Sequence, residues 1–161
     1  SKALGEKFEP FLHFVMGPIL AAATQTIDLQ MEDATAEEAN TEGQHDEDTG
    51  IDSAVINFGG GIYKRVSMNT YAVQQKKSAA SLLFEYASNM KGHLSAYLGN
   101  SLDALLPMVT DKHSADIRSS ASMGIARVFE AAIDAHKKGK PSKLQLPQVL
   151  EASLTCLITG L

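Results

Sequence analysis

The sequence predicts an all-α fold, an α-α superhelix in which paired helices stack along one axis. Two observations predict it: apolar residues recur at helical spacing over most of the 161 residues, and the pattern of one helix recurs at fixed offsets along the chain. A third observation is one acidic stretch between two helices. We therefore expect a single segment over residues 1–161, with about two and a half repeats and an acidic flexible loop at 28–52.

The first helix is expected between residues 4 and 26. Its apolar residues are spaced by three and four: Phe8, Phe11, Leu12, Val15, Met16, Ile19 and Leu20. Two prolines interrupt this stripe. Because proline lacks a backbone N–H and clashes with the preceding turn, we expect Pro10 near the helix start and a bend at Pro18.

Residues 28–52 contain ten Asp or Glu residues and no Lys or Arg, so this stretch carries −10 and the rest of the chain carries +5. It has almost no apolar residues beyond Leu29 and Met31. Such a composition buries too little surface to offset the entropy of ordering, and a mobile inter-helix loop is predicted. The residues after it favour β structure and flank Gly59, Gly60 and Gly61, which predicts a small hairpin or an extended turn.

Helical periodicity resumes at residue 70 and continues to the end of the chain. We expect helices at 70–90, 94–109, 114–135 and 146–161. The turn "TDKHS" separates the second from the third, and the basic loop "HKKGKPSK" precedes the last, with Gly139 and Pro141 as helix breakers.

Three of the expected helices share one apolar template. The apolar positions of the helix at 94–109 recur 52 residues later and 86 residues earlier: Leu94, Tyr97, Leu98, Leu102, Leu105 and Leu106. The helix at 70–90 overlays the helix at 114–135 at an offset of 41, which pairs Lys77 with Arg118 and Ala80 with Ala121. Helix pairs that recur in this way predict a solenoid, in which each pair buries its apolar face against its neighbours.

The stretch "DKHSADIRSSASMGIARV", residues 111–128, resembles a HEAT motif. An Asp in the turn precedes Ile-Arg and then small residues at helical spacing. Ala121, Gly124 and Ala126 are expected to let helices approach closely, and Arg118 to bond to turn carbonyls or to an Asp of the adjacent repeat. The predicted fold is therefore a HEAT-repeat, armadillo-like solenoid.

The order of these segments resembles the middle of the importin-beta family of karyopherins, and within it the importin-beta-3 subgroup. The likeness lies mainly in "KKSAASLLFEYASNMKGHLSAYL" and the "DIRSSA" helix that follows, over roughly residues 50–135. The resemblance implies an internal HEAT-repeat fragment of a nuclear transport receptor, present in cytoplasm and nucleus and at the nuclear pore.

Such receptors, as the resemblance implies, bind protein cargo with basic import signals, the Ran GTPase and phenylalanine-glycine (FG) nucleoporins. The family's main Ran-binding repeats are N-terminal and absent from this stretch, so Ran and the nucleoporins are expected partners of the full-length protein. The alternative is a generic HEAT-repeat scaffold or adaptor subunit with no Ran-dependent transport role.

The stretch "EGQHDEDTG", residues 42–50, is the first candidate site. An EF-hand calcium loop needs an oxygen ligand at its fifth position, Gly at the sixth and Glu at the twelfth, but a loop starting at Asp46 has Gly50, Ile51 and Asn57 there. Two interpretations remain, a solvated spacer or an acidic surface that attracts basic cargo. The second makes cargo-binding candidates of Glu42, Asp46, Glu47 and Asp48.

A second candidate surface lies on the polar sides of the helices at 94–109 and 146–161. The resemblance implies that these helices line a concave, cargo-binding face, where Asn100, Asp103 and Glu151 are the candidates. The alternative is that these three side chains are ordinary solvated polar groups.

No residue pattern predicts catalysis, and we expect a binding protein without a cofactor. The five histidines are scattered without paired-ligand spacing, and Cys156 lies in an apolar helix where we expect it to be buried. No run of apolar residues is long enough for a membrane span. The basic loop lacks neighbouring aromatic residues, so no direct nucleic-acid binding is expected.

Overall fold

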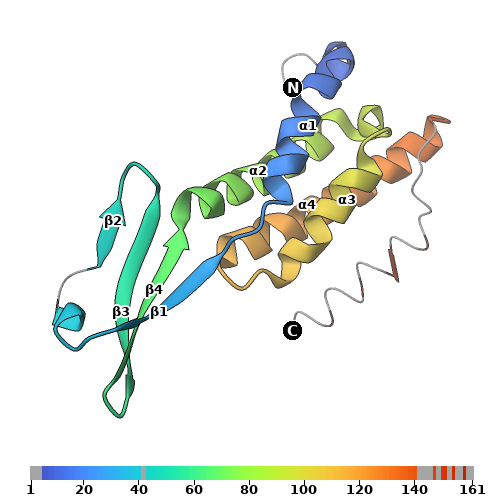
Figure 1. The fold of residues 1–161 in the computed structure, drawn as a ribbon. Coiled ribbons are helices and arrows are strands. Elements are labelled where there is room, and N and C mark those ends of the chain that lie inside the picture. Colours follow the sequence, from blue (N-terminus) through green and yellow to red (C-terminus); the bar gives the residue numbers. More distant parts are fainter. Residues whose placement is uncertain are drawn as a thin grey trace. The chain divides into compact units, whose positions relative to one another are not determined.

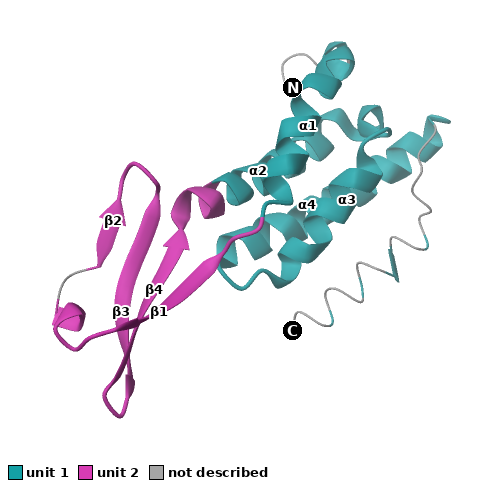
Figure 2. Cartoon of the chain, in the orientation of Figure 1, with its two compact units in different colours: residues 1–25, 75–161 teal, residues 26–74 magenta. Residues whose placement is uncertain are grey.

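The computed structural model describes residues 5–40 and 43–140, together with the single positions 147, 150, 151, 154 and 158. The chain divides into two compact units (Figure 2). One comprises residues 26–74 and is built on a β-sheet. The other comprises residues 1–25 and 75–161 and is built on helices.

The sheet unit contains a four-stranded antiparallel sheet (Figure 1). Its strands lie in the order β1-β4-β3-β2: β1 (Leu29–Ala34), β2 (Gln44–Asp46), β3 (Ile51–Gly59) and β4 (Ile62–Asn69). A short 3-10 helix, η2 (Glu38–Asn40), follows β1. The prediction of an all-α fold with a long acidic inter-helix loop is therefore wrong, because residues 28–52 contain β1, β2 and the start of β3.

Alternation along β1 explains why this acidic stretch forms a strand. Leu29 and Met31 are two residues apart, as are Gln30 and Glu32, and this is the period of a strand with one apolar and one polar face. The composition of residues 28–52 does not reveal this strand, because the apolar partners of β1 lie in β4, where Met68 pairs with Leu29.

Ion pairs with β4 neutralise part of the acidic charge. Lys64 Nζ donates to Asp33 Oδ1 at 2.5 Å and lowers the pKa of Asp33. Arg65 Nη2 donates to Glu38 Oε1 at 2.7 Å. The acidic stretch itself has no Lys or Arg, and β4 supplies the two that pair with it.

The hairpin predicted around Gly59, Gly60 and Gly61 is confirmed, and its strands are longer than expected. The β3–β4 register runs from Ile51 opposite Asn69 to Gly59 opposite Ile62. All three glycines have positive φ angles, between 63° and 90°, a region that favours glycine at a tight reversal of the chain.

The helical unit follows the predicted segments more closely. Its helices are η1 (Gly5–Phe11), α1 (Leu12–Ala23), most of α2 (Thr70–Met90), η3 (Lys91–Leu94), α3 (Leu98–Leu105), η4 (Leu106–Thr110) and α4 (Ala115–Lys137). The helices predicted at 70–90 and 114–135 are confirmed as α2 and α4. The helix predicted at 94–109 is broken into α3 and η4, and the first predicted helix is 3-10 through Pro10.

The helix predicted at 146–161 lies largely outside the described residues, as does Cys156. The five described positions in that stretch are helical, and Leu150, Leu154 and Ile158 are exposed there.

Close packing of α4 depends on small residues. This was predicted for three positions and is confirmed at two of them. Ala121 and Gly124 are buried, and a Cβ at Gly124 would lie 3.1 Å from Leu105 Cδ1. Ala126 is exposed instead, so the expectation was wrong there, because this position faces away from the buried side of α4.

The turn before α4 is organised by Asp111, which is 8% exposed. Its Oδ1 accepts the backbone N–H of His113 at 2.9 Å and of Ser114 at 3.1 Å, and Lys76 Nζ lies 3.3 Å from Oδ2. Burial opposes ionisation, but these N–H groups and the ammonium prevail and lower the pKa of Asp111. Arg118 donates to the Asp111 carbonyl at 2.9 Å, which confirms its predicted bond to a turn carbonyl.

A Gly92→Ala substitution tests the close approach between η3 and α4. The added Cβ would lie 2.9 Å from Ala135 N and 3.0 Å from Ala135 Cα, both backbone atoms that cannot move aside easily. We expect a decrease of about 1–3 kcal/mol in the free energy of unfolding, measured by urea titration followed by circular dichroism. The matched control is Gly99→Ala in the first turn of α3, where an added Cβ meets no other part of the fold within 4 Å, and it should leave stability unchanged or raise it by less than about 1 kcal/mol. Equal effects of the two substitutions would contradict this packing.

An Asp111→Ala substitution should lower the free energy of unfolding by about 2–3 kcal/mol, because it leaves two N–H groups and Lys76 without their acceptor. Since the pKa of Asp111 is below its ordinary 3.8 in the folded chain, its contribution is complete above that pH and is lost on further acidification. The difference from wild type should therefore shrink in acid. Asp116→Ala, which removes an exposed carboxylate 2.5 Å from Lys77 Nζ, is the control and should change stability by less than about 1 kcal/mol.

Candidate functional site

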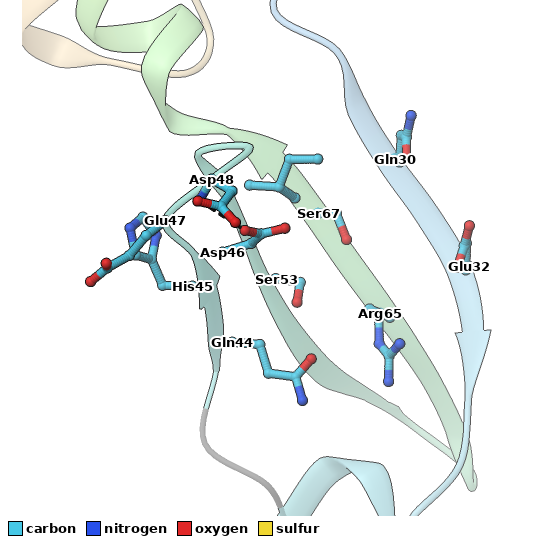
Figure 3. A pocket seen from close by; sticks show the side chains of 11 residues that line it. Gln30, Glu32, Gln44, His45, Asp46, Glu47, Asp48, Ser53, Arg65 and Ser67 are labelled. Atoms are coloured by element: carbon cyan, nitrogen blue, oxygen red, sulfur yellow. Dashed lines mark hydrogen bonds between the residues drawn. The ribbon is translucent and has the colours of Figure 1, made fainter.

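One face of the sheet is polar and holds an open groove of about 790 Å³ (Figure 3). The strand register explains its composition, because side chains on one face of neighbouring strands lie opposite each other. Gln30 of β1 pairs with Ser67 of β4, Ser67 with Ser53 of β3, and Ser53 with Gln44 of β2. Small or uncharged polar side chains therefore cross the sheet along the groove.

Carboxylates surround this row. Glu32 lines the groove from β1, and Asp46, Glu47 and Asp48 line it from the end of β2 and the turn that follows. Arg65 also lines the groove, but it is paired with Glu38. In the described part of the chain, Glu32, Glu47 and Asp48 have no ion-pair partner, so the groove is negatively charged at neutral pH.

The acidic turn is ordered by its own hydrogen bonds. Asp46 Oδ1 accepts the backbone N–H of Asp48 at 3.0 Å and of Thr49 at 3.3 Å. The Thr49 hydroxyl and then these two N–H groups lower the pKa of Asp46, which keeps its carboxylate ionised. Figure 3 shows Asp46 and Asp48 turned toward β4, and Glu47 turned away from it.

The first turn of α2 anchors the acidic turn. The Tyr71 hydroxyl donates to the Glu47 carbonyl at 2.7 Å, while the Gly50 carbonyl accepts the backbone N–H of Thr70 at 2.8 Å and its hydroxyl at 2.9 Å. Gly50 has a φ of +65°, and its hydrogen atom faces the Tyr71 ring. Sequence reasoning missed these anchors, because they join residues about twenty positions apart.

The candidates from the acidic stretch are thus brought together in part. Asp46, Glu47 and Asp48 share the groove, and the structure adds Glu32, whose position in the alternating pattern of β1 was the available signal. Glu42 lies outside the described residues.

The remaining candidates belong to the helical unit. Asn100 and Asp103 are exposed and three residues apart in α3, so they share one side of that helix. Glu151 is an exposed, helical position.

Two further searches concern the described residues alone. They contain no group of three or more His, Cys, Asp or Glu side chains arranged to hold a metal ion. None of their helices is long and apolar enough to cross a membrane.

The fold is similar to that of a segment of a karyopherin, a class of nuclear transport receptor. The matching structures are of Kap121p. The structure bound to the extreme C-terminus of the phosphatase Cdc14p matches with a TM-score of 0.74 and 23% identity, and the RanGTP-bound structure with 0.73 and 23%. The structure bound to Ste12p matches with 0.71 and 22%. Each match covers 98% of this chain and 14% of Kap121p.

The chain therefore spans about one seventh of the length of the karyopherins it matches, and at this identity the likeness establishes the fold. No family model and no curated protein matches the sequence. The importin-beta-3 subgroup stays a prediction.

A Gly50→Ala substitution tests whether α2 holds the acidic turn. An added Cβ would lie 2.2 Å from the Tyr71 ring, and the alanine would have to keep a positive φ angle, which L-residues disfavour. The turn must therefore move away from the first turn of α2. We expect faster amide hydrogen exchange at Asp48 and Thr49, measured by NMR. Gly60→Ala is the control, since Gly60 has a similar φ of +63° but no atom within 4 Å of an added Cβ. Unchanged exchange at Asp48 in Gly50→Ala would contradict the anchoring.

Proposed function

We propose that this chain is part of a nuclear transport receptor of the importin-beta family and binds protein cargo that carries basic import signals. The observation that carries the proposal is the fold match, which spans 98% of this chain with a TM-score of up to 0.74 among the Kap121p structures compared. Kap121p has been solved bound to Ste12p, Nup53p, Pho4p and RanGTP, so the class acts by binding proteins. By this proposal the chain has no catalytic role.

The groove of the sheet supplies a surface of the right charge. Glu32, Glu47 and Asp48 have no ion-pair partner in the described part of the chain, and Asp46 stays ionised, so lysine and arginine side chains find acceptors there. The turn is already held by Tyr71 and Thr70, which reduces the entropy lost when it binds a partner. We propose that Glu42, which lies outside the described residues, also takes part in binding basic cargo.

The exposed side of α3 is proposed as a second contact, through Asn100 and Asp103, with Glu151 as a further candidate. All three side chains are exposed, and the two acidic ones have the same sign of charge as the groove.

In the full-length protein, RanGTP and FG nucleoporins are the proposed further partners, and the protein is proposed to move between cytoplasm and nucleus through the nuclear pore. The competing function is a scaffold or adaptor subunit that binds its partners independently of Ran. Sensitivity to RanGTP separates the two.

The test is a pulldown of basic import signals by the full-length parent protein at increasing salt, with and without RanGTP. We expect RanGTP to abolish binding. Binding that RanGTP does not affect, or the absence of binding, would contradict the transport function and favour the scaffold.

The same assay tests the groove through the triple variant Glu32→Gln, Glu47→Gln and Asp48→Asn. Deleting residues 28–52 is unsuitable because it would remove β1 and β2. At low salt we expect about tenfold weaker binding, since each exposed pair contributes up to about 1 kcal/mol, and the difference should diminish as salt screens it. The matched control, Glu85→Gln, Asp116→Asn and Glu130→Gln, removes the same charge from α2 and α4 and should bind as wild type.

A further inference from the structure

Strand β1 forms an edge of the sheet, and its outer side is open to another strand. It pairs with β4 alone, in an unbroken register from Leu29 opposite Met68 to Ala34 opposite Tyr63. Within the described residues, no other backbone group bonds to β1. An edge of this kind presents alternate N–H and C=O groups to an extended chain. The opposite edge, β2, has only three residues, whereas β1 has six.

The face behind the acidic groove is exposed and carries apolar side chains between two ion pairs, Asp33–Lys64 and Asp52–His45. Leu29 is 46% and Met31 is 56% exposed on β1. Met31 continues an apolar row through Val66 of β4 to Ala54 of β3, whereas the row of Leu29 runs through Met68 to Asp52. A groove of about 370 Å³ lies on this face and is lined in part by Leu29, Ala54, Ile56, Val66 and Met68. A strand added beside β1 therefore places every second side chain on the side of Leu29, Met31 and the paired Asp33, and the others on the side of Gln30, Glu32 and Ala34.

The charge of β1 determines which strand fits. Natural edges are often protected by lysine, proline or a bulge, and β1 has none of these. Its charged residues are Glu32 and Asp33, and Asp28 precedes it. A second copy of β1 would bring like charges side by side, which disfavours pairing between copies. A basic strand gains from Glu32, which has no ion-pair partner in the described part of the chain, whereas Asp33 lies on the other face of β1 and is paired with Lys64.

We propose that β1 binds an extended polypeptide segment, with lysine or arginine at every second position and apolar residues between them, as a fifth strand of the sheet. The backbone of the segment bonds to the open edge, its basic side chains lie on the side of Glu32, and its apolar side chains lie on the side of Leu29 and Met31. This inference deepens the proposed function and rests on it in one respect, since the segment is taken to belong to cargo.

Peptide backbone methylation tests strand addition directly. The probe is a lysine-valine alternating peptide of about seven residues, enough to span β1, titrated into the 161-residue chain at low salt by fluorescence anisotropy. Two versions carry N-methyl groups at either the lysine or the valine positions. Only alternate N–H groups face β1, so one version should bind at least about tenfold more weakly while the other keeps its affinity. Equal affinities would overturn strand addition.

Protein variants locate the edge. Glu32→Lys should weaken the probe about tenfold, whereas Glu130→Lys, the same charge change on α4, should have less than about a threefold effect. NMR should show slowed amide exchange at alternate residues of β1, and slowing confined to other residues would overturn the assignment.

The two proposals fail separately. If the probe does not bind but the parent protein binds cargo in a RanGTP-sensitive way, the edge proposal is wrong and the transport function stands. If the probe binds with alternate sensitivity to methylation but RanGTP has no effect on the parent protein, the edge proposal stands and the transport function is wrong.

Discussion

The direct junction between β4 and α2 determines the arrangement of the sheet unit. Asn69 is the last residue of β4 and Thr70 the first of α2, so no linker separates ladder from helix. Asn69 Oδ1 accepts the N–H of Ala72 at 3.0 Å, which satisfies a free donor of the first helical turn, and Thr70 donates twice to the Gly50 carbonyl. The end of the ladder, the start of the helix and the position of the acidic turn are therefore coupled through adjacent residues.

The helices could be predicted because their evidence is local. Apolar spacing defined α2 and α4, and of the two partners expected for Arg118, a turn carbonyl or an Asp of the adjacent repeat, the structure has the turn carbonyl. The sheet could not be predicted in the same way, because its stability depends on partners far along the chain. Taken alone, the composition of residues 28–52 predicts disorder, because Lys64 and Arg65, which pair with two of its carboxylates, lie outside this stretch. Once β4 lies beside β1, the same carboxylates have ion-pair partners.

The candidate site shows the same division. A run of charge was sufficient to select Asp46, Glu47 and Asp48, but Glu32 required the strand register, which places it on the groove side of β1. The pairing of Arg65 with Glu38 was equally hidden, and it neutralises the guanidinium that lines the groove, which makes the groove more negative. An acidic stretch held on a sheet presents its charges at fixed separations, whereas a mobile loop would present an average. For the cargo binding proposed above, this difference favours discrimination between basic segments by spacing as well as by net charge.

The glycine tip of the β3–β4 hairpin has a practical consequence. A Cβ placed at Gly59, Gly60 or Gly61 meets no atom within 4 Å, but the positive φ of all three favours glycine, so residues are better added between the glycines than substituted for them. The tip also lies at the far end of both strands from the junction with α2, where Ile51 pairs with Asn69. A fluorophore or a short epitope inserted there leaves the ladder and the acidic turn intact. The chain thus carries its own attachment point for immobilisation or single-molecule labelling.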